Sequence, residues 1–583
     1  MIKELFAYTG KYRTAMLKSL FCTLGEVLCE LSIPYLMSLV VDRGIPAQDI
    51  GYIAAVGGGM AGLALAAILC GLLNMRYAAV VSQGFAANLR GAVYEQVGRF
   101  SFGNIDAFSG ASLITRMTND VTQLQTSTLM MLRMLARAPL MLVCALAISM
   151  SINFRLSLVV VVAIVLLFSG TFLIMRYARA LFRAMQRKLD ALNATVQENL
   201  IAIRVVKAFV REQYEKEKFR RVNDDMTAAA IRAGRVASLM MPGMTLVLGA
   251  TMIAVIWFGG RMVGAGGLLT GELMSFISYI MQILMSVMIF SMILMMLTRA
   301  RASAERILEV LNTEPAIRDS ASALQERPRV RDGRVEFRDV SFRYCEFDEN
   351  GKECALVLEG ISFVAKPGDV VGIVGETGSG KTSLVGLIPR FYDICSGAVF
   401  VDGIDVRNYA QEDLRDGIGM VMQKNNLFSG TIRENILWGD EGADMERVEA
   451  AARDAQAHGF IVAFPQGYET ELGQGGVNVS GGQKQRICIA RAMIKRPKIL
   501  ILDDSTSAVD TATEAGIRRA LRENYVDATV ILVAQRIASV READRILVLG
   551  DGRLEASGTH DELMAAGGTY AEIYNSQSEG GLA

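Results

Sequence analysis

Histidine is scarce in this sequence, because only His458 and His560 occur among its 583 residues. Any chemistry that needs an imidazole therefore has two candidates. Net charge is also lacking, since 60 basic and 60 acidic side chains cancel, and this balance gives no argument for nucleic acid as a partner. Eight cysteines are present, but their spacings match neither a zinc site nor a short secreted disulfide framework. We therefore expect all eight to be structural, either in apolar runs or in a reducing cytosol.

Apolar residues, by contrast, are abundant and unevenly placed. They make up 52% of the chain, and the mean hydropathy is +0.32. They dominate the first half, whereas the second half has the composition of an ordinary globular domain. A chain of this length exceeds what one hydrophobic core supports, so at least two domains are expected. We predict a membrane domain over 1–312, a polar linker over 313–333 and a second domain over 334–583.

Six apolar runs in the first half reach or approach the ~20 residues that a helix needs to cross ~30 Å of hydrocarbon. They cover about 13–41, a stretch that begins near Tyr52, 132–151, 156–175, 237–259 and 273–297. The two long connections, after the second and the fourth run, carry most of the lysines and arginines. The positive-inside rule therefore predicts that both connections and both chain ends are cytoplasmic.

Polar and sulfur-containing side chains inside these runs are candidates for cargo contact. Glu26 and Glu30 stand four apart in the first run and share one helical face. A carboxylate in hydrocarbon is costly, so both should face the bundle interior or water. Contact between helices and contact with a substrate or cation both remain open. Methionines repeat at helical spacing in the sixth run, either for packing or as an adaptable wall for apolar ligands: Met281, Met285, Met288, Met292 and Met295.

The second half of the chain contains a phosphate-binding motif. Residues 375–382 read GETGSGKT, follow the strand-like run 369–374 and precede a helical run, which is the context that the P-loop motif requires. Its glycines let successive N–H groups point at phosphates, and the helix N-terminus adds its positive dipole end. The expected nucleotide-binding residues here are Gly375, Glu376, Thr377, Gly378, Ser379, Gly380, Lys381, Thr382 and Ser383. Lys381 would reach the β and γ phosphates of ATP or GTP, and Thr382 would bind Mg²⁺.

Two further motifs complete this constellation. The apolar strand KILILDD ends in Asp503, which is placed to hold the magnesium ion directly or through water. Between the two lies VSGGQ, in which the residues after Val479 could form a second phosphate nest at a helix start: Ser480, Gly481, Gly482 and Gln483.

Together these motifs resemble the nucleotide-binding domain of ABC transporters over about 335–563. In that resemblance Tyr344 matches the aromatic residue that stacks on adenine, Gln423 the glutamine that touches Mg²⁺, and residues 505–510 the D-loop. The six preceding spans resemble the exporter (type IV) branch, so the likeness covers nearly the whole chain. It implies a six-helix all-α transmembrane domain followed by an α/β P-loop domain, with ATP and Mg²⁺ as cofactors.

The resemblance also implies a setting and a partner. It places the protein in the bacterial plasma membrane, working by alternating access with a second half-transporter subunit, among membrane lipid, on an amphipathic drug, lipid or peptide. Segments 110–121 and 199–209, in the two long connections, would dock onto the nucleotide domains. Segment 110–121 resembles the intracellular-loop motif of exporter-type proteins. The alternative is that both are ordinary amphipathic helix surfaces.

Two positions depart from the family pattern, and both concern catalysis. The glutamate that normally polarises the attacking water is Asp504 here, one methylene shorter, and such a displacement can cost on the order of 10²-fold in rate. The histidine that normally contacts the γ-phosphate is Gln535, which carries no positive charge. We therefore expect the degenerate half of a heterodimeric exporter, with weak hydrolysis at its own P-loop. The alternative is a self-sufficient homodimer.

Overall fold

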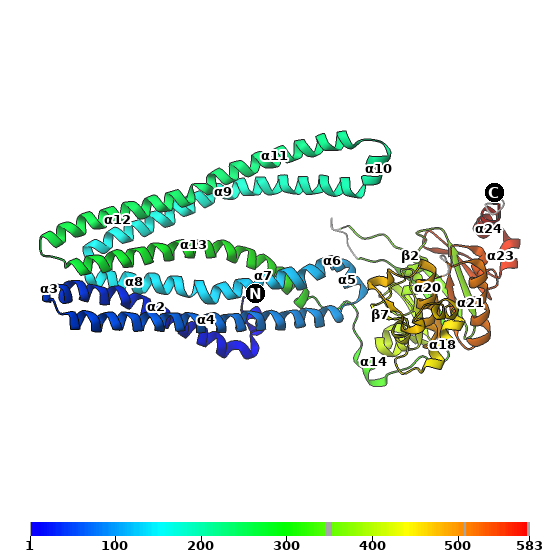
Figure 1. Cartoon of the computed structure of the whole chain (residues 1–583). Coiled ribbons are helices and arrows are strands. Elements are labelled where there is room, and N and C mark those ends of the chain that lie inside the picture. Colours follow the sequence, from blue (N-terminus) through cyan, green and yellow to red (C-terminus); the bar gives the residue numbers. More distant parts are fainter. Residues whose placement is uncertain (1, 346–351, 506–508, 580–583) are drawn as a thin grey trace. The chain divides into compact units, whose positions relative to one another are not determined.

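The computed structural model describes residues 2–345, 352–505 and 509–579, with only the backbone given for residues 2, 3 and 291–299. Figure 1 shows the whole chain. It divides into a membrane unit, Met1–Gly98 with Ala111–Thr313, and a nucleotide unit, Arg99–Gly110 with Glu314–Ala583.

The membrane unit is entirely helical, as far as the structure describes it. Its helices are α1 (Ile2–Ala7), α2 (Arg13–Leu39), α3 (Ile45–Ala47), α4 (Ile50–Gly98), α6 (Gly110–Thr115), α7 (Val121–Met130), α8 (Arg137–Ile152), α9 (Phe154–Ile201), α10 (Ile203–Ala208), α11 (Glu212–Ser238), α12 (Met240–Gly264) and α13 (Thr270–Asn312). Short π-helical turns lie at Val40–Gly44, Arg116–Asp120 and Met131–Leu135.

Among the described residues of this unit, six helical segments are long and apolar enough to cross a membrane, which confirms the six predicted spans. Several extend far beyond one bilayer, because α4 has 49 residues and α9 has 48, whereas ~20 suffice. The excess forms helical extensions of the spans, as the few glycines and prolines of the long connections predict.

The core of the membrane unit forms where α13 passes α2 and α8. Tyr279 of α13 is fully buried, and its hydroxyl donates to the Leu31 carbonyl at 2.8 Å. Nearby, the Ser275 hydroxyl donates to the Pro34 carbonyl at 2.6 Å. Because these donors are satisfied by a neighbouring helix, polar side chains are accommodated without an unpaired group in hydrocarbon.

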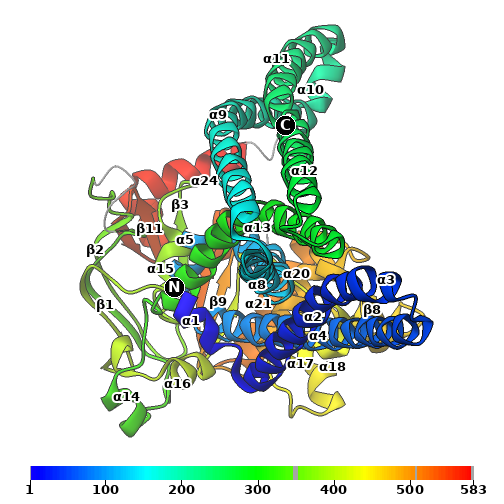
Figure 2. The ribbon, with the colours of Figure 1, turned by 90° about the vertical axis from the view of Figure 1, so that its left-hand side faces the viewer.

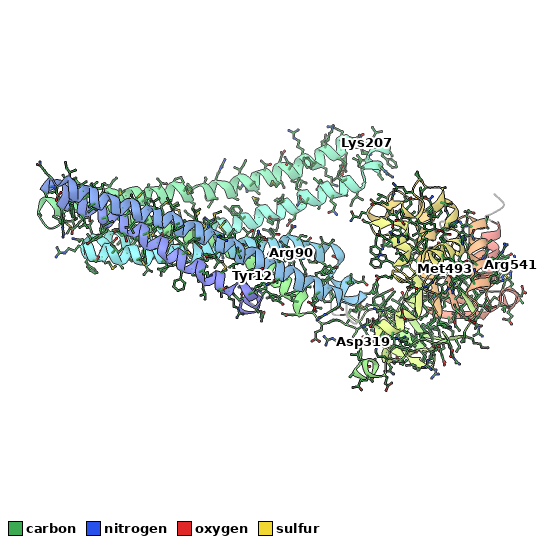
Figure 3. The ribbon with its side chains drawn as sticks, turned by 60° about the horizontal axis from the view of Figure 1, so that its bottom comes forward. Tyr12, Arg90, Lys207, Asp319, Met493 and Arg541 are labelled. Atoms are coloured by element: carbon green, nitrogen blue, oxygen red, sulfur yellow. A yellow bond between two sulfur atoms is a disulfide. The ribbon has the colours of Figure 1, made fainter. Side chains whose placement is uncertain are left out.

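The remaining long helices form an arm of the unit that shares this core, because Val160 of α9 and Val255 of α12 belong to the same buried cluster as Tyr279. Figure 2 shows α9, α11 and α12 on one side of α8 and α13, with α2 and α4 on the other. α9 and α11 are joined by α10, and Lys207 lies at this end of the arm (Figure 3). α10 occupies the second predicted docking segment, and Phe209 beside it is 73% exposed.

The nucleotide unit is an α/β domain with two main sheets. Its strands are β1 (Val335–Phe342), β2 (Leu358–Ala365), β3 (Val370–Gly375), β4 (Ser396–Val401), β5 (Ile404–Asp405), β6 (Ile418–Val421), β7 (Gly430–Thr431), β8 (Glu471–Leu472), β9 (Ile499–Asp503), β10 (Thr529–Val533), β11 (Arg545–Gly550) and β12 (Arg553–Gly558). One sheet has the order β2-β1-β4-β5 and is antiparallel, and the other has the order β12-β11-β3-β10-β9-β6. In the second sheet β11, β3, β10, β9 and β6 run parallel.

Helices pack around these sheets. They are α5 (Phe102–Phe108), α14 (Ala321–Glu326), α15 (Lys381–Gly386), α16 (Gln411–Asp416), α17 (Ile432–Leu437), α18 (Met445–Asp454), α19 (His458–Val462), α20 (Gly481–Met493), α21 (Thr511–Asn524), α22 (Ile537–Val540), α23 (His560–Ala566) and α24 (Thr569–Glu579). β9 is buried at every position, as expected for a parallel strand covered on both faces. The predicted α/β fold of this half is confirmed.

One helix of the nucleotide unit comes from the first long connection. The ring of Phe102 in α5 packs on that of Phe391, with centroids 4.4 Å apart, and the Tyr392 hydroxyl donates to Asp106 at 2.7 Å. Within the predicted docking segment 110–121, Arg116 pairs with Glu309 of α13 in the membrane unit at 2.7 Å. α5 is therefore the part of this connection that belongs to the nucleotide unit, and docking by 110–121 stays a prediction.

The cysteines also differ from expectation. Cys345 and Cys354 form a disulfide in the connection between β1 and β2. The prediction that all eight cysteines are structural filler is therefore wrong for this pair. The other six are free, and four of them lie in helices of the membrane unit as predicted.

Candidate functional site

The predicted nucleotide residues converge at one edge of the parallel sheet. β3 ends at Gly375 and β9 at Asp503, and β10 lies between these two strands. Gln423 and Gln535 each follow the last residue of a strand, β6 and β10, by two positions. The carboxyl ends of parallel strands meet at one edge, and ligands of open α/β sheets bind there.

The P-loop adopts a backbone that only glycine accommodates. Gly380 has φ +91°, and a Cβ built on it would lie 2.7 Å from Leu358 Cδ2 and 3.0 Å from the Val357 carbonyl oxygen. A Cβ on Gly375 would lie 2.1 Å from the Leu549 carbonyl oxygen. The loop therefore wraps closely over its neighbours before α15 begins at Lys381.

Lys381 is folded over this loop. Its ammonium donates to the Gly375 carbonyl at 2.9 Å and to the Glu376 carbonyl at 2.7 Å. Burial lowers the pKa of Lys381, and the nearby carboxylates of Asp503 and Asp504 oppose that change. The ammonium is thus held by neutral carbonyls that a phosphate could replace.

The two predicted magnesium-binding side chains meet directly. The Thr382 hydroxyl donates to Asp503 Oδ1 at 3.2 Å. Asp503 is 1% exposed, and burial raises its pKa. A hydroxyl and a carboxylate offer the hard oxygen atoms that Mg²⁺ prefers, so the residues present fit this cation. When bound with ATP, Mg²⁺ neutralises charge that develops on the phosphates.

The two departures from the family pattern contact each other. Gln535 Nε2 donates to Asp504 Oδ2 at 2.8 Å, and Gln423 hydrogen-bonds the same carboxyl group. Burial raises the pKa of Asp504, and the Gln423 hydrogen bond, the Lys381 charge and the Gln535 hydrogen bond oppose the rise. Asp504 is therefore held by two neutral amides beside the P-loop lysine.

The predicted adenine-stacking residue also lies next to the P-loop helix. The Tyr344 hydroxyl and the Ser383 hydroxyl are 2.6 Å apart and share a hydrogen bond. The Tyr344 ring packs edge-on against Phe342 and Tyr392, with centroids 4.9 and 5.1 Å away. It remains 50% exposed, so one face is open for a base.

The VSGGQ segment forms the N-terminus of α20. Ser480 is the N-cap residue, its Oγ accepts from the Gln483 backbone N–H at 3.3 Å, and its own N–H donates to Gln483 Oε1 at 2.9 Å. This capping box leaves the Gly481 and Gly482 N–H groups at the positive end of the helix. Of the predicted D-loop, Thr506–Ala508 lie outside the described residues.

Neither histidine takes part in the site. His458 Nδ1 lies 2.8 Å from the Tyr468 hydroxyl and His560 Nδ1 lies 2.7 Å from the Tyr570 hydroxyl. Each histidine is thus hydrogen-bonded to a tyrosine ten residues further along the chain.

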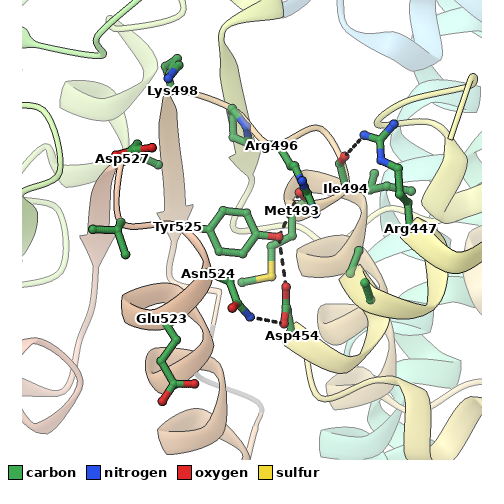
Figure 4. Close-up of a pocket in the computed structure, with 15 residues that line it drawn as sticks. Arg447, Asp454, Met493, Ile494, Arg496, Lys498, Glu523, Asn524, Tyr525 and Asp527 are labelled. Atoms are coloured by element: carbon green, nitrogen blue, oxygen red, sulfur yellow. Dashed lines mark hydrogen bonds between the residues drawn. The ribbon is translucent and has the colours of Figure 1, made fainter.

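The nucleotide unit also contains a cavity of about 700 Å³, shown in Figure 4. Its lining includes Lys498 and Ala528, which directly precede β9 and β10. It therefore lies at the amino ends of the strands, away from the P-loop. The Tyr525 hydroxyl donates there to the Met493 carbonyl at 3.1 Å and to Asp454. Because these groups satisfy one another, we assign this cavity no nucleotide role.

Comparison with known proteins identifies the chain. Residues 16–287 match the family model of the ABC transporter transmembrane region, and residues 358–507 match the family model described as ABC transporter. An uncharacterized ABC transporter ATP-binding protein of Bacillus subtilis is 40% identical over 96% of this chain and 96% of its own length. The chain belongs to the ABC transporter family.

Two further likenesses place this ABC transporter within the family. A fatty acid ABC transporter ATP-binding/permease protein of Mycobacterium bovis is 36% identical over 91% of this chain and 82% of its own length. A solved bacterial Atm1-family ABC exporter with ATP bound is 27% identical, covers 97% of this chain and 98% of its own, and has a TM-score of 0.80. The chain is an integral-membrane ABC exporter half-transporter, and the predicted fold class is confirmed.

Some site contacts have no counterpart in the sequence prediction. Gln485 of α20 donates to the Asp504 carbonyl at 3.2 Å, and α5 contributes Asp106 to a hydrogen bond with Tyr392. Gln485 follows the VSGGQ segment by two residues, so its place next to that motif could have indicated a role in the site. For α5 the sequence offered none, because its partners lie almost 300 positions away along the chain.

Proposed function

We propose that this ABC transporter chain is the degenerate-site subunit of a heterodimeric exporter. On this proposal its P-loop binds ATP and Mg²⁺ but hydrolyses ATP slowly, while its VSGGQ segment completes a competent site on the partner subunit. The observation that carries the proposal is the hydrogen bond between Gln535 and Asp504, at 2.8 Å.

This contact bears on the position of the attacking water. A residue that activates or orients water must lie within hydrogen-bond reach of it. The Asp504 carboxylate is one methylene shorter than the glutamate usual in this family, and one of its oxygens already accepts from Gln535. Gln535 is neutral, so it gives no positive charge to the γ-phosphate. Both changes lower transition-state stabilisation at this P-loop.

The intact parts of the site support the other half of the proposal. Ser480 caps α20, and Gly481 has nothing within 4 Å of a built Cβ. An unobstructed helix N-terminus is suited to a phosphate group. In this family two nucleotide-binding domains enclose two ATP molecules. Each site combines the P-loop of one subunit with the segment of the other subunit that corresponds to VSGGQ. The VSGGQ segment can thus serve a partner even when the P-loop of its own chain is slow.

The distribution of charge supports a membrane orientation, and a relative supports a class of cargo. Basic residues concentrate in the connection formed by the ends of α9, α10 and α11, which supports a cytoplasmic location for that end. The chain would then lie in the bacterial plasma membrane, with both termini and the nucleotide unit in the cytoplasm. The cargo would be an amphipathic drug, lipid or peptide, in keeping with a relative whose name specifies fatty acid.

The test is ATP turnover in lipid, measured for this chain alone and for a complex with a similar half-transporter that has glutamate and histidine at the two positions. We expect negligible turnover alone and strong turnover for the pair. Asp504→Asn should leave most of the pair's activity, whereas Glu→Gln at the partner's catalytic position should remove it. Brisk, vanadate-sensitive turnover by this chain alone would overturn the proposal.

A self-sufficient homodimer is the second candidate, and one observation favours it. Asp504 keeps a carboxylate in the catalytic position, and burial raises its pKa, which makes it a stronger base than an exposed aspartate. In a homodimer Asp504→Asn would abolish turnover altogether. The same variant therefore separates the two candidates.

A further inference from the structure

A cavity of about 610 Å³ lies within the membrane unit. It is lined by residues of α2, α4, α8 and α13 and of the π-helical turn before α8. Much of its apolar wall is methionine, from three different spans: Met75, Met134, Met141, Met281 and Met285. Flexible, polarisable thioethers adapt to acyl chains of varied shape. Met281 and Met285 thus belong to the adaptable wall that was one of the two roles considered for the methionine repeat.

One side of this cavity carries an excess negative charge. Arg137 Nη1 pairs with Glu26 Oε1 at 2.8 Å, and Arg137 Nη2 pairs with Glu30 Oε2 at 2.6 Å. Two carboxylates share one guanidinium, so the three side chains together keep one uncompensated negative charge. Glu26 and Glu30 therefore contact another helix and also face the cavity.

The opposite charge lies one helical turn away. Arg133 lines the same cavity, four residues before Arg137, and it has no hydrogen-bond or ion-pair partner among the residues that the structure describes. A cation without a partner inside a membrane span is unfavourable, so an anion is expected beside it. Arg133 also belongs to the π-helical turn Met131–Leu135, and such turns are frequent at functional sites.

The cavity also contains a polar atom without a hydrogen-bond donor. Gln282 lines it, and its Oε1 atom is buried without a hydrogen-bond partner in the described structure. A buried acceptor of this kind is costly unless a donor reaches it. An N–H group of a bound ligand would supply that donor.

We infer that this cavity binds the headgroup of a zwitterionic phospholipid that has a primary ammonium. The phosphate pairs with Arg133, the ammonium with the Glu26–Glu30 side and Gln282, and the acyl chains lie along the methionines. Two arginines and two glutamates sum to zero charge, so a neutral ligand with separated charges fits better than a simple anion or cation. The inference rests on the proposed amphipathic cargo and names its class.

The test is lipid retention by the detergent-purified full-length chain or its complex, measured by native mass spectrometry without nucleotide. The probes are phosphatidylethanolamine, anionic phosphatidylglycerol and octadecylammonium, which lacks a phosphate. We expect phosphatidylethanolamine to bind about tenfold more tightly than either comparator, as one additional charge-assisted hydrogen bond gives. Tighter phosphatidylglycerol or octadecylammonium binding would overturn the inference, as would equal retention of all three probes.

Variants give the inference a second readout. Arg133→Gln should weaken both phosphatidylethanolamine and phosphatidylglycerol, whereas Glu26→Gln with Glu30→Gln should weaken phosphatidylethanolamine alone. Retained phosphatidylglycerol binding then shows that the glutamate variant is folded. Arg76→Gln is the matched control, because Arg76 follows Met75 in α4 but does not line the cavity. Equal losses of lipid retention in the Arg133→Gln and Arg76→Gln variants would overturn the inference. Since nucleotide is absent, failure here leaves the ATPase test of the proposed function unaffected.

An independent observation concerns the disulfide beside Tyr344. Cys345 is the next residue in the chain, and its bond to Cys354 closes a connection of sequence separation 9 between β1 and β2. Cys345 is exposed and Cys354 is partly exposed, so a small thiol can reach the bond. Disulfides in cytosolic proteins are usually transient and redox-sensing.

The geometry points to a redox-sensitive nucleotide site. A low-molecular-weight disulfide oxidises the pair by thiol–disulfide exchange. The two cysteine thiols lose two protons and two electrons, the bond Cys345 Sγ–Cys354 Sγ forms, and the oxidant leaves as two thiols. The closed bond holds Tyr344 beside Ser383, 2.6 Å away. Reduction removes that constraint, so an adenine base must order Tyr344 when it binds.

The test compares the oxidised chain with the chain reduced by tris(carboxyethyl)phosphine, by calorimetric titration with Mg-ATP. We expect reduction to weaken ATP binding about two- to tenfold, the effect of immobilising one side chain, and to leave tripolyphosphate binding unchanged, because that ligand has no base. Cys345→Ser with Cys354→Ser should bind like the reduced chain and ignore the reductant, whereas Cys395→Ser should behave like the natural chain. No change in ATP affinity, or an equal change for tripolyphosphate, would overturn the assignment.

Discussion

At the scale of single residues, Asp504 and Gln535 show why a change of one methylene and one charge matters. Aspartate in place of glutamate and glutamine in place of histidine are each conservative in size. Both residues nevertheless lie at the carboxyl edge of the sheet, next to Lys381. The hydrogen bond between them, at 2.8 Å, makes them one unit, so their effects on rate should not add independently.

Restoring both residues should restore hydrolysis. We expect Asp504→Glu with Gln535→His to raise ATP turnover at this P-loop on the order of 10²-fold, because the longer carboxylate reaches the water position and the imidazole can contact the γ-phosphate. Either single variant should gain much less. Phosphate release in lipid measures this, with Lys381→Ala in the restored background as the control that must be inactive. Turnover unchanged in the double variant would contradict the prediction.

Gly380 offers a test of the P-loop backbone itself. Gly380→Ala should reduce ATP affinity at least about tenfold, because φ is +91° and the new Cβ would lie 2.7 Å from Leu358 Cδ2. Gly386→Ala is the matched control, since Gly386 is in α15 and has open space at its Cβ position. Calorimetric titration of both variants measures the difference. Equal affinities would show that the loop adjusts to a side chain.

At the scale of elements, what the sequence could predict depended on how local the determining contacts are. The P-loop, the β9 strand and the α20 start were predicted because each motif specifies its own backbone within a few residues. α5 was missed because it has seven residues and packs through contacts with 314–316 and 391–392. The Cys345–Cys354 bond was missed because the cytosolic setting argued against any disulfide.

Asn104 holds α5 in place and can be tested alone. Its Oδ1 accepts from the Ala316 N–H at 2.9 Å and from the Ser101 hydroxyl at 2.7 Å. Asn104→Ala leaves these donors without that partner, so the free energy of local opening should fall by about 1–3 kcal/mol. Hydrogen exchange of α5 and of residues 314–316 should speed up accordingly, while β9 stays protected. Unchanged exchange in α5 would mean that the Phe102 ring contact and the Asp106–Tyr392 hydrogen bond fix the helix without Asn104.

The start of α20 allows a charge test of the proposed shared site. A Cβ on Gly481 meets nothing within 4 Å, and a carboxylate in the first turn of a helix is favourable, so Gly481→Asp should fold. Its charge should repel a phosphate bound by the partner and lower the pair's ATP turnover by about 10²-fold. Gly481→Asn, which is isosteric and neutral, is the control. A similar loss in both variants would indicate a steric effect instead of repulsion.

At the scale of the whole molecule, the two units were predictable to different depths. Hydropathy alone was sufficient for six spans, because a bilayer imposes length and composition on every one of them. The arm of α9, α11 and α12 was not predictable, since its position beside α8 and α13 depends on packing between helices far apart in sequence. The cavity of Arg133 has the same origin, because four helices contribute to it.

Orientation is the property of the whole chain that one labelling experiment decides. Ala265 lies exposed between α12 and α13, and Lys207 lies exposed at α10. If the basic connections are cytoplasmic, a membrane-impermeant maleimide should label Ala265→Cys in intact cells and Lys207→Cys only after permeabilisation. The unsubstituted chain is the control for its own eight cysteines. Labelling of Lys207→Cys in intact cells would reverse the orientation. It would also place the P-loop away from cytoplasmic ATP, and this result would overturn the proposed function.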